Sequence, residues 1–350
     1  PYESFFQRII KQLDKHIVLK EFRIMKVFNS TLTKRDFLLT SALLPGAINT
    51  SLAQSDYPNK PIRLVFPFGP GAEVTTRAVL KSMSDKLGQP FIIDFKPGAS
   101  TNIGAALVAQ AAPDGYTLFF STIGSNVLNK LLHKNLTYDP DSLVPIGLIG
   151  QVSSYLIVRN DSPFKSVDDL VKAAKAAPTG LSYGTHAIGG PNHLVGELFK
   201  NKAGIKELVH VAYKGLNESS TDLIAGRIDF MWDAGAIRLV EQGRLRALAV
   251  AYPERWPTLP NLPTMAELGY PEVTLTAFGG IHAPAKTPAH IVDKLSSALM
   301  SALTEPEVKK VVLQGNMVSK PMSKQETGEF IKGLTVKWAP IVKSLNISLD

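Results

Sequence analysis

From Tyr57 onward, short β-rich runs alternate with longer stretches of helical apolar spacing, and this alternation limits the possible folds most strongly. The runs 61–66, 91–95 and 117–121 are compact and apolar, as in strands that a parallel sheet buries on both faces. Helical stretches cover 73–87 and 100–112 between them. Such alternation predicts doubly wound α/β sheets.

The same rhythm continues through the middle of the chain and changes after Val250. The middle predicts strands at 155–158, 181–183, 208–212, 228–232 and 247–251, and helices at 167–177, 191–203 and 218–225. A proline-rich stretch at 255–263 follows, then a strand-like run at 273–282 and helical patterns over 288–345. We expect this late helical stretch to return and cover the first part of the fold.

Composition narrows the class of protein. A chain of 350 residues with 45% apolar residues fits one large or two medium domains. The formal net charge is +8, but the first 53 residues hold eight Lys or Arg against four Asp or Glu, which is half of the excess. The other charges are interspersed and form no basic stripe, so no nucleic acid is expected as a partner. The chain has no cysteine, which excludes thiol catalysis and disulfides and agrees with export.

Residues 26–53 have the layout of a signal peptide. Lys26, Lys34 and Arg35 precede a short apolar segment at 37–44, which is too short to span a bilayer. The small–x–small pattern at 51–53 predicts cleavage after Ala53 and a periplasmic location.

Two details of this region have alternative interpretations. The stretch 33–38 resembles a twin-arginine signal with Lys in place of the first Arg, although we favour the Sec route. Residues 1–24 have the spacing of a basic amphipathic helix, but we favour translation from Met25, because a signal peptide normally stands first. The segment 1–53 is therefore expected to be absent from the mature fold.

Three predicted strand-to-helix junctions are rich in small residues. Open α/β sheets bind ligands beyond the carboxyl ends of their strands, where helix N-termini offer unpaired N–H groups that suit anions. The candidate ligand-binding residues at these junctions are Phe68, Gly69, Gly71, Ala72 and Glu73 in the first, Ser121, Thr122, Gly124 and Ser125 in the second, and Tyr183, Thr185, His186 and Gly189 in the third.

Some polar residues near these junctions have two interpretations. His186 either contacts the ligand or is a turn residue, and Lys214 either attracts an anionic ligand or is an exposed charge. Asp233 either contacts the ligand or caps the following helix. His193 and Glu197 have the helical spacing of a metal pair, but no third ligand is near in the sequence, so no metal is expected.

The junctions and several other segments together resemble the Bug family, the exported receptors of tripartite tricarboxylate transporters. The resemblance covers Tyr57 to the C-terminus. It rests on the following segments, which occur in family order: 57–63, 96–104, 112–118, 193–199, 213–215, 243–250, 262–264 and 283–284.

The resemblance implies a periplasmic binding protein of the Venus-flytrap type, type II-like. We expect lobe 1 to comprise 57–154 and 277–350, and lobe 2 to comprise 155–276. The implied function is to bind a small carboxylate (a di- or tricarboxylate, an amino acid or an aromatic acid) and pass it to the transporter's membrane subunits. No cofactor is implied, and the receptor is expected to be a monomer.

The chain departs from the family pattern at the first junction and after Asp233. Arg77 fits the family's Arg, but Glu73 stands where Asp is usual, Ala72 replaces a Gly, and the loop is about two residues short. The segment 234–237 is also about two residues short, and Phe278 stands where Trp is common. These departures leave the ligand's identity open.

The sequence contains few residue patterns typical of catalytic sites. The stretch 98–102 lacks the second Gly of a nucleophile elbow, and 69–76 lacks the ending of a phosphate-binding loop. We therefore expect a non-enzymatic protein. Two alternatives stay open: an enzyme on the same fold, by analogy alone, and a ligand-sensing receptor for a membrane kinase.

Overall fold

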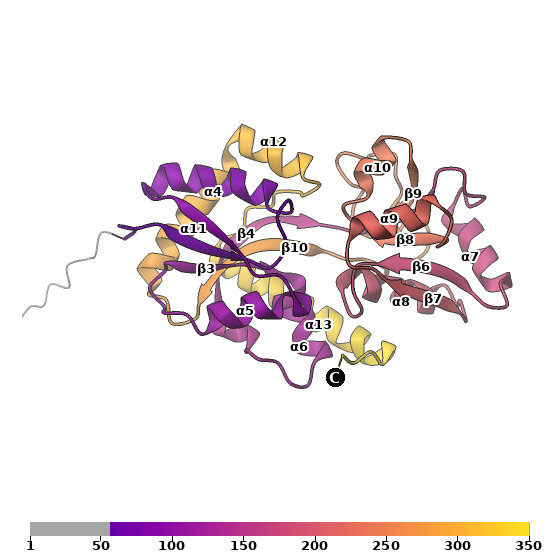
Figure 1. Cartoon of the computed structure of the whole chain (residues 1–350), viewed down its shortest axis with the longest axis horizontal. Coiled ribbons are helices and arrows are strands. Elements are labelled where there is room, and N and C mark those ends of the chain that lie inside the picture. The colour runs from indigo at the N-terminus through magenta and orange to yellow at the C-terminus, as the bar shows by residue number, and fades with distance from the viewer. Residues whose placement is uncertain (1–56, 350) are drawn as a thin grey trace, which may run out of the picture. The chain divides into compact units, whose positions relative to one another are not determined.

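The computed structural model describes residues 57–349, so the predicted signal peptide and residues 1–24 lie outside the described residues. The described elements form two five-stranded sheets flanked by helices (Figure 1). The predicted doubly wound α/β fold is confirmed.

The first sheet has the strand order β2-β1-β3-β10-β4. β1 pairs in parallel with β2 and β3, whereas β10 is antiparallel to β3 and β4. The strands are β1 (Ile62–Phe66), β2 (Phe91–Phe95), β3 (Thr117–Thr122), β4 (Leu143–Val152) and β10 (Ala277–Pro284). The sequence patterns predicted the first three, missed β4 and placed the start of β10 four residues too early.

The second sheet has the order β7-β6-β8-β5-β9. β6 pairs in parallel with β7 and β8, and β5 is antiparallel to β8 and β9. Its strands are β5 (Tyr155–Arg159), β6 (Leu181–Thr185), β7 (Leu208–Ala212), β8 (Phe230–Asp233) and β9 (Leu245–Val250).

The chain passes between the sheets twice. It leaves β4 at Val152 and enters the second sheet as β5 at Tyr155, and it leaves β9 at Val250 and returns as β10 at Ala277. The two strands that follow these crossings, β5 and β10, are the antiparallel members of their sheets. Each sheet therefore contains one strand that arrives from the other.

Helices cover both faces of each sheet. They are α4 (Val74–Leu87), α5 (Asn102–Ala109), α6 (Asn129–Leu132), α7 (Val167–Ala176), α8 (Pro191–Lys202), α9 (Leu216–Ile224), α10 (Ile237–Glu241), α11 (Ala289–Thr304), α12 (Pro306–Gln314) and α13 (Lys324–Leu345). Alternation along β1 explains the two faces: Leu64 and Phe66 pack with α4 and α11, and Val65 packs with α5. Short 3-10 turns at Ala99–Thr101 and Pro140–Ser142 and a π-helical turn at Gly124–Leu128 complete the elements.

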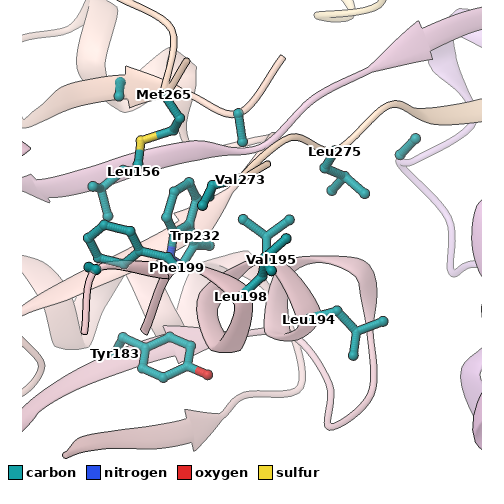
Figure 2. Close-up of a cluster of buried hydrophobic side chains, with 14 of the residues drawn as sticks. Leu156, Tyr183, Leu194, Val195, Leu198, Phe199, Trp232, Met265, Val273 and Leu275 are labelled. Carbon is teal, nitrogen blue, oxygen red and sulfur yellow. The ribbon is translucent and has the colours of Figure 1, made fainter. Parts of the chain in front are cut away.

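The second sheet buries a large aromatic core under α8 (Figure 2). The Trp232 ring meets the Phe199 ring edge-on, with centroids 5.7 Å apart. Tyr183 lies under Gly196, where any Cβ would collide with the tyrosine ring. This packing fixes α8 against β6 and β8 and so fixes the loop that joins β6 to α8.

The late helices partly follow the expectation. α11 and α12 pack on α4 and cover the first sheet, as predicted. α13 begins with a capping box between Ser323 and Glu326 and contacts β4, but it also contacts α8 of the second sheet. Its buried Trp338 belongs to the same core cluster as Leu194 of α8, so this helix joins the two sheets.

Candidate functional site

The carboxyl ends of parallel neighbours meet at one edge of each sheet. In the first sheet these are the ends of β2, β1 and β3, and in the second the ends of β7, β6 and β8. Ligands of open α/β sheets bind beyond such ends. We define the first-sheet loops as 67–73, 96–101 and 123–126, and the second-sheet loops as 186–190, 213–215 and 234–236.

The turn after α12 lies against the start of α4 and against the loop after β8. A Cβ added at Gly315 would overlap Thr75 Oγ1, in the first turn of α4. The neighbouring Asn316 donates from Nδ2 to the Ala234 carbonyl (2.8 Å) and accepts from the Tyr155 hydroxyl at Oδ1 (2.9 Å). The start of α4 and the loop after β8 therefore approach the same two residues.

The loop after β1 is held together by its own acid. Glu73 Oε2 accepts the Gly71 N–H at 2.6 Å, and Oε1 accepts from Arg77 Nε at 3.0 Å. The pKa of the Glu73 carboxyl is lowered, chiefly by its own backbone N–H and, against the opposing effect of burial, by Arg77 and Gly71. Glu73 is buried as a charged group. Its carboxylate already accepts the N–H of Gly71, one of the residues that we expected to bind the ligand.

The other predicted residues of this loop are accessible. Gly71 and Ala72 are exposed, and Gly69 is half-buried. Phe68 is 39% exposed, although its ring leans edge-on against Phe66. The loop thus offers a ligand a small apolar surface beside an internally paired acid.

The loop after β3 engages its hydroxyls within the protein. Thr122 and Ser125 exchange reciprocal hydrogen bonds between backbone N–H and side-chain oxygen, at 3.0 and 3.3 Å. Ser121 is fully buried, and its Oγ lies 2.6 Å from His282 Nδ1 of β10. Burial lowers the pKa of His282 to about 3. Of the predicted residues here, Thr122 and Gly124 are half-buried and Ser125 is buried.

The loop after β2 is a site feature that the sequence patterns missed. Ala99, Ser100 and Thr101 have consecutive positive φ angles of 45°, 50° and 79°, which are costly for residues with a Cβ. The buried Thr101 Oγ1 has no hydrogen-bond partner among the described residues and lies 3.8 Å from the place where Gly124 would carry a Cβ. The sequence did single out this loop in another way, because the segment 96–104 is one of those that support the family resemblance.

The loop after β6 is tied to the neighbouring strand β7. Thr185 is buried and lies 2.7 Å from His210 Nε2 of β7 through its Oγ1, and its carbonyl accepts the Tyr213 N–H. Gly189 has a φ of +72° and donates its N–H to His193 Nδ1 at 2.9 Å. A Cβ at Gly189 would lie 2.6 Å from Leu349 Cδ1.

Tyr183 does not reach this loop with its side chain. The ring is fully buried, and the hydroxyl donates to Glu197 Oε1 at 2.6 Å. Desolvation, followed by the effect of Glu197, raises the pKa of Tyr183 far above its usual value. Glu197 thus pairs with a tyrosine, and only the backbone of Tyr183 remains for a ligand.

His193 and His210 stack beneath this loop, with ring centroids 4.0 Å apart. Burial lowers the pKa of His193 to about 4. Burial, and then the neighbouring His193, lowers the pKa of His210 to about 4. Both rings are therefore neutral at pH 7 and serve as hydrogen-bond partners of the loop.

His186 and Asp233 join the loops after β6 and β8. His186 Nε2 lies 2.8 Å from Asp233 Oδ2, with the histidine side chain 37% exposed and the aspartate 1%. Asp233 Oδ1 accepts the Ala236 N–H at 2.7 Å, just before α10. Asp233 is therefore not the N-cap of α10, which is Ala236; one of its oxygens binds the amide just before that helix, while the other faces His186.

Lys214 follows β7 and is exposed, and no ion pair involves it within residues 57–349. The described residues contain no group of three or more His, Cys, Asp or Glu placed to hold a metal ion. None of the helices within 57–349 combines the length and apolar character needed to cross a membrane.

The chain is similar to known receptors over most of its length. A family model described as "Tripartite tricarboxylate transporter family receptor" matches residues 75–347. The protein BugT of Bordetella pertussis is 29% identical over 314 residues, which are 87% of this chain and 95% of BugT.

Solved structures agree with the fold. A Rhodopseudomonas palustris protein solved with adipate is 32% identical, with a TM-score of 0.77, over 83% of this chain and 99% of that one. MatC from the same organism, with bound malate, is 26% identical, with a TM-score of 0.73, over 82% of this chain and all of MatC.

Proposed function

We propose a function from the premise that this chain belongs to the tripartite tricarboxylate transporter receptor family. The protein binds a small carboxylate at the first-sheet and second-sheet loops and delivers it to the membrane subunits of such a transporter. Relatives solved with adipate and with malate support a carboxylate as the ligand.

The observation that carries this proposal is that the start of α4 and the loop after β8 approach one turn. Gly315 touches the start of α4, and Asn316 binds the loop after β8. A small molecule beside this turn would meet backbone N–H groups and small side chains from both sheets. Helix N-termini and glycine-containing loops suit an anion of this size.

We further propose that the two sheets belong to separate lobes, 57–154 with 277–350 and 155–276, which close on the ligand. A ligand that contacts both lobes only when they are closed shifts the population toward that state. The chain crosses at 153–154 and 251–276, so these segments would carry the hinge. A reduced radius of gyration in small-angle scattering with saturating ligand is the expected result.

Binding without catalysis is part of the proposal. A serine with a possible base beside it occurs at Ser121, whose Oγ lies 2.6 Å from His282 Nδ1. Ser121 and His282 are 0% and 1% exposed, and burial keeps the pKa of His282 near 3. No substrate reaches such a serine without opening the first sheet, so the pair supports a structural role.

The periplasm is the proposed location, because the family is one of transporter receptors and residues 26–53 have the pattern of a signal peptide. A monomer is the proposed state. Size-exclusion chromatography with light scattering tests it, and a dimer mass would contradict it.

A binding panel tests the central function. The purified protein should be titrated calorimetrically with malate, adipate, succinate, glutamate and benzoate, with benzamide and adipamide as uncharged controls. A ligand at a hundred times its Kd stabilises the folded state by about 2.7 kcal/mol, so thermal shifts should rank the acids in the same order. Absence of heat and of thermal shift with every acid would contradict the proposal.

A further inference from the structure

The His186 side chain presents one ring nitrogen to the protein and leaves the other accessible. Nε2 is buried and lies 2.8 Å from Asp233 Oδ2. No hydrogen bond involves Nδ1 among residues 57–349, and 37% of the side chain is exposed. This half-exposed ring stands in the loop that opens α8, one residue after the carboxyl end of β6.

Asp233 has a hydrogen bond at one oxygen and lies against the imidazole with the other, whose 2.8 Å contact lacks hydrogen-bond geometry. Its Oδ1 accepts the Ala236 N–H, and its Oδ2 faces the imidazole. A carboxylate that is 1% exposed needs a charged or hydrogen-bonding partner, because an unpaired buried charge is strongly unfavourable. An imidazolium at His186 provides that partner.

The surrounding charges favour the protonated imidazole. Burial opposes the charge on His186, but Asp233, and then Glu218 of α9, outweigh burial and raise the pKa of His186 above its usual value. The neighbouring elements also carry Lys214, after β7, and His193 and His210, whose pKa values burial lowers to about 4. Two acids therefore face His186 from β8 and α9.

We propose that His186 is the cationic anchor for the ligand's carboxylate, donating from Nδ1, and that Asp233 is the residue that positions it. The inference rests on the proposed function and adds the group that recognises the charge. A histidine anchor differs from a backbone cradle in that it titrates, so affinity for a carboxylate depends on pH.

Calorimetry with probes that stay mostly ionised across the pH range tests this dependence. Benzoate, succinate and adipate should be titrated at constant ionic strength from about pH 6 to about pH 9, where all are predominantly ionised. Affinity should be highest at the acidic end and fall about ten- to a hundredfold as His186 loses its proton, the range that a hydrogen bond between charged groups contributes. Loss of the proton at higher pH removes the cation, which fixes the direction of the change.

Three variants separate the anchor from its alternatives. His186→Gln should bind about ten- to a hundredfold more weakly at pH 6 and lose the pH dependence. Asp233→Asn keeps an oxygen for the Ala236 N–H but removes the charge, so the fall in affinity should shift to lower pH. His290→Gln, at an exposed position on α11, is the matched control and should follow the wild-type profile.

The outcomes distinguish the anchor from the receptor function. Binding by the wild type with a flat pH profile, or unchanged affinity in His186→Gln, overturns the anchor and leaves the receptor function in place. An unshifted profile in Asp233→Asn overturns the positioning role. Absence of binding by the wild type to every probe overturns both the function and the anchor.

Discussion

The loops after β1 and after β6 stand at equivalent places in the two sheets, yet they present opposite chemistry. Each follows the middle strand of a parallel triplet, leads into a long helix and contains a glycine with positive φ, Gly71 or Gly189. The loop after β1 contains an acid that binds its own amide, while the loop after β6 exposes a histidine backed by a buried acid.

The difference shows that small-residue content alone does not define an anion site. A helix N-terminus attracts negative charge, but the N-cap residue of α4 is Glu73, whose carboxylate already lies there and accepts the Gly71 N–H. The N-cap residue of α8 is Gly190, which carries no charge. The second-sheet loops should therefore supply most of the attraction for a carboxylate.

The largest effect is expected from Gly189→Val. Positive φ costs a β-branched residue about 1–3 kcal/mol, and the clash with Leu349 adds an overpacking cost of about 1–3 kcal/mol. We expect the free energy of unfolding to fall by about 4 kcal/mol in urea denaturation. Gly71→Val is the matched variant, because Gly71 has a φ of +102° but no atom within 4 Å of the added Cβ. This variant should lose only the free energy that the positive φ costs. Equal losses would show that Leu349 moves aside.

Acid should destabilise the protein through the stacked histidines. The folded pKa of His193 is about 4, below the unfolded value of 6.5, so stability is complete above about pH 6.5 and falls as pH drops toward 4. At about 1.4 kcal/mol per unit, His193 alone accounts for up to about 3 kcal/mol. His193→Asn retains an acceptor for the Gly189 N–H and should flatten this part of the stability profile. An unchanged dependence of stability on pH in this variant would show that other groups cause the acid sensitivity.

Removing the acid of the first loop should make the two loops more alike. Glu73→Gln deletes a negative charge beside the Gly71 amide, so the second carboxylate of adipate or succinate should meet less repulsion. We expect affinity for these diacids to rise about tenfold, or about 1.4 kcal/mol, by calorimetry. Benzoate, with one carboxylate, is the control ligand and should change little. A parallel gain for benzoate would place its carboxylate near Glu73.

The smallest effects are expected from the buried hydroxyls. Thr185 pairs with His210, and Ser125 pairs with Thr122, so neither is free to serve a ligand. Thr185→Ala and Ser125→Ala should each cost about 1 kcal/mol of stability and change affinity less than threefold. A larger loss of affinity in either variant would mean that the hydroxyl turns toward the ligand on binding.

The sequence predicted the sheets well because their apolar runs are long and compact. It missed β4 because Pro145, Gly147 and Gly150 interrupt the run, and these residue types are depleted in strands. The structure explains Gly150: a Cβ there would lie 2.9 Å from the Val318 carbonyl, which pairs with Gln151. This contact depends on a segment more than 160 residues away, so no local pattern contains it.

The sequence located the loops of the candidate site but not the contacts that their side chains make. The junctions after β1, β3 and β6 were located from small residues alone. The burial of Tyr183, the internal pairing of Glu73 and the contact of His186 with Asp233 depend on how neighbouring strands are ordered. Strand order is a property of the sheet, and the sequence patterns specify only the strands.

A crystal structure with the tightest-binding acid of the panel would show which loop holds the carboxylate. We expect a carboxylate oxygen within hydrogen-bond distance of His186 Nδ1 at the second-sheet loops, with Glu73 still bound to the Gly71 N–H. A carboxylate seated on the Gly71 amide, with Glu73 displaced and His186 without contact to the ligand, would contradict this expectation.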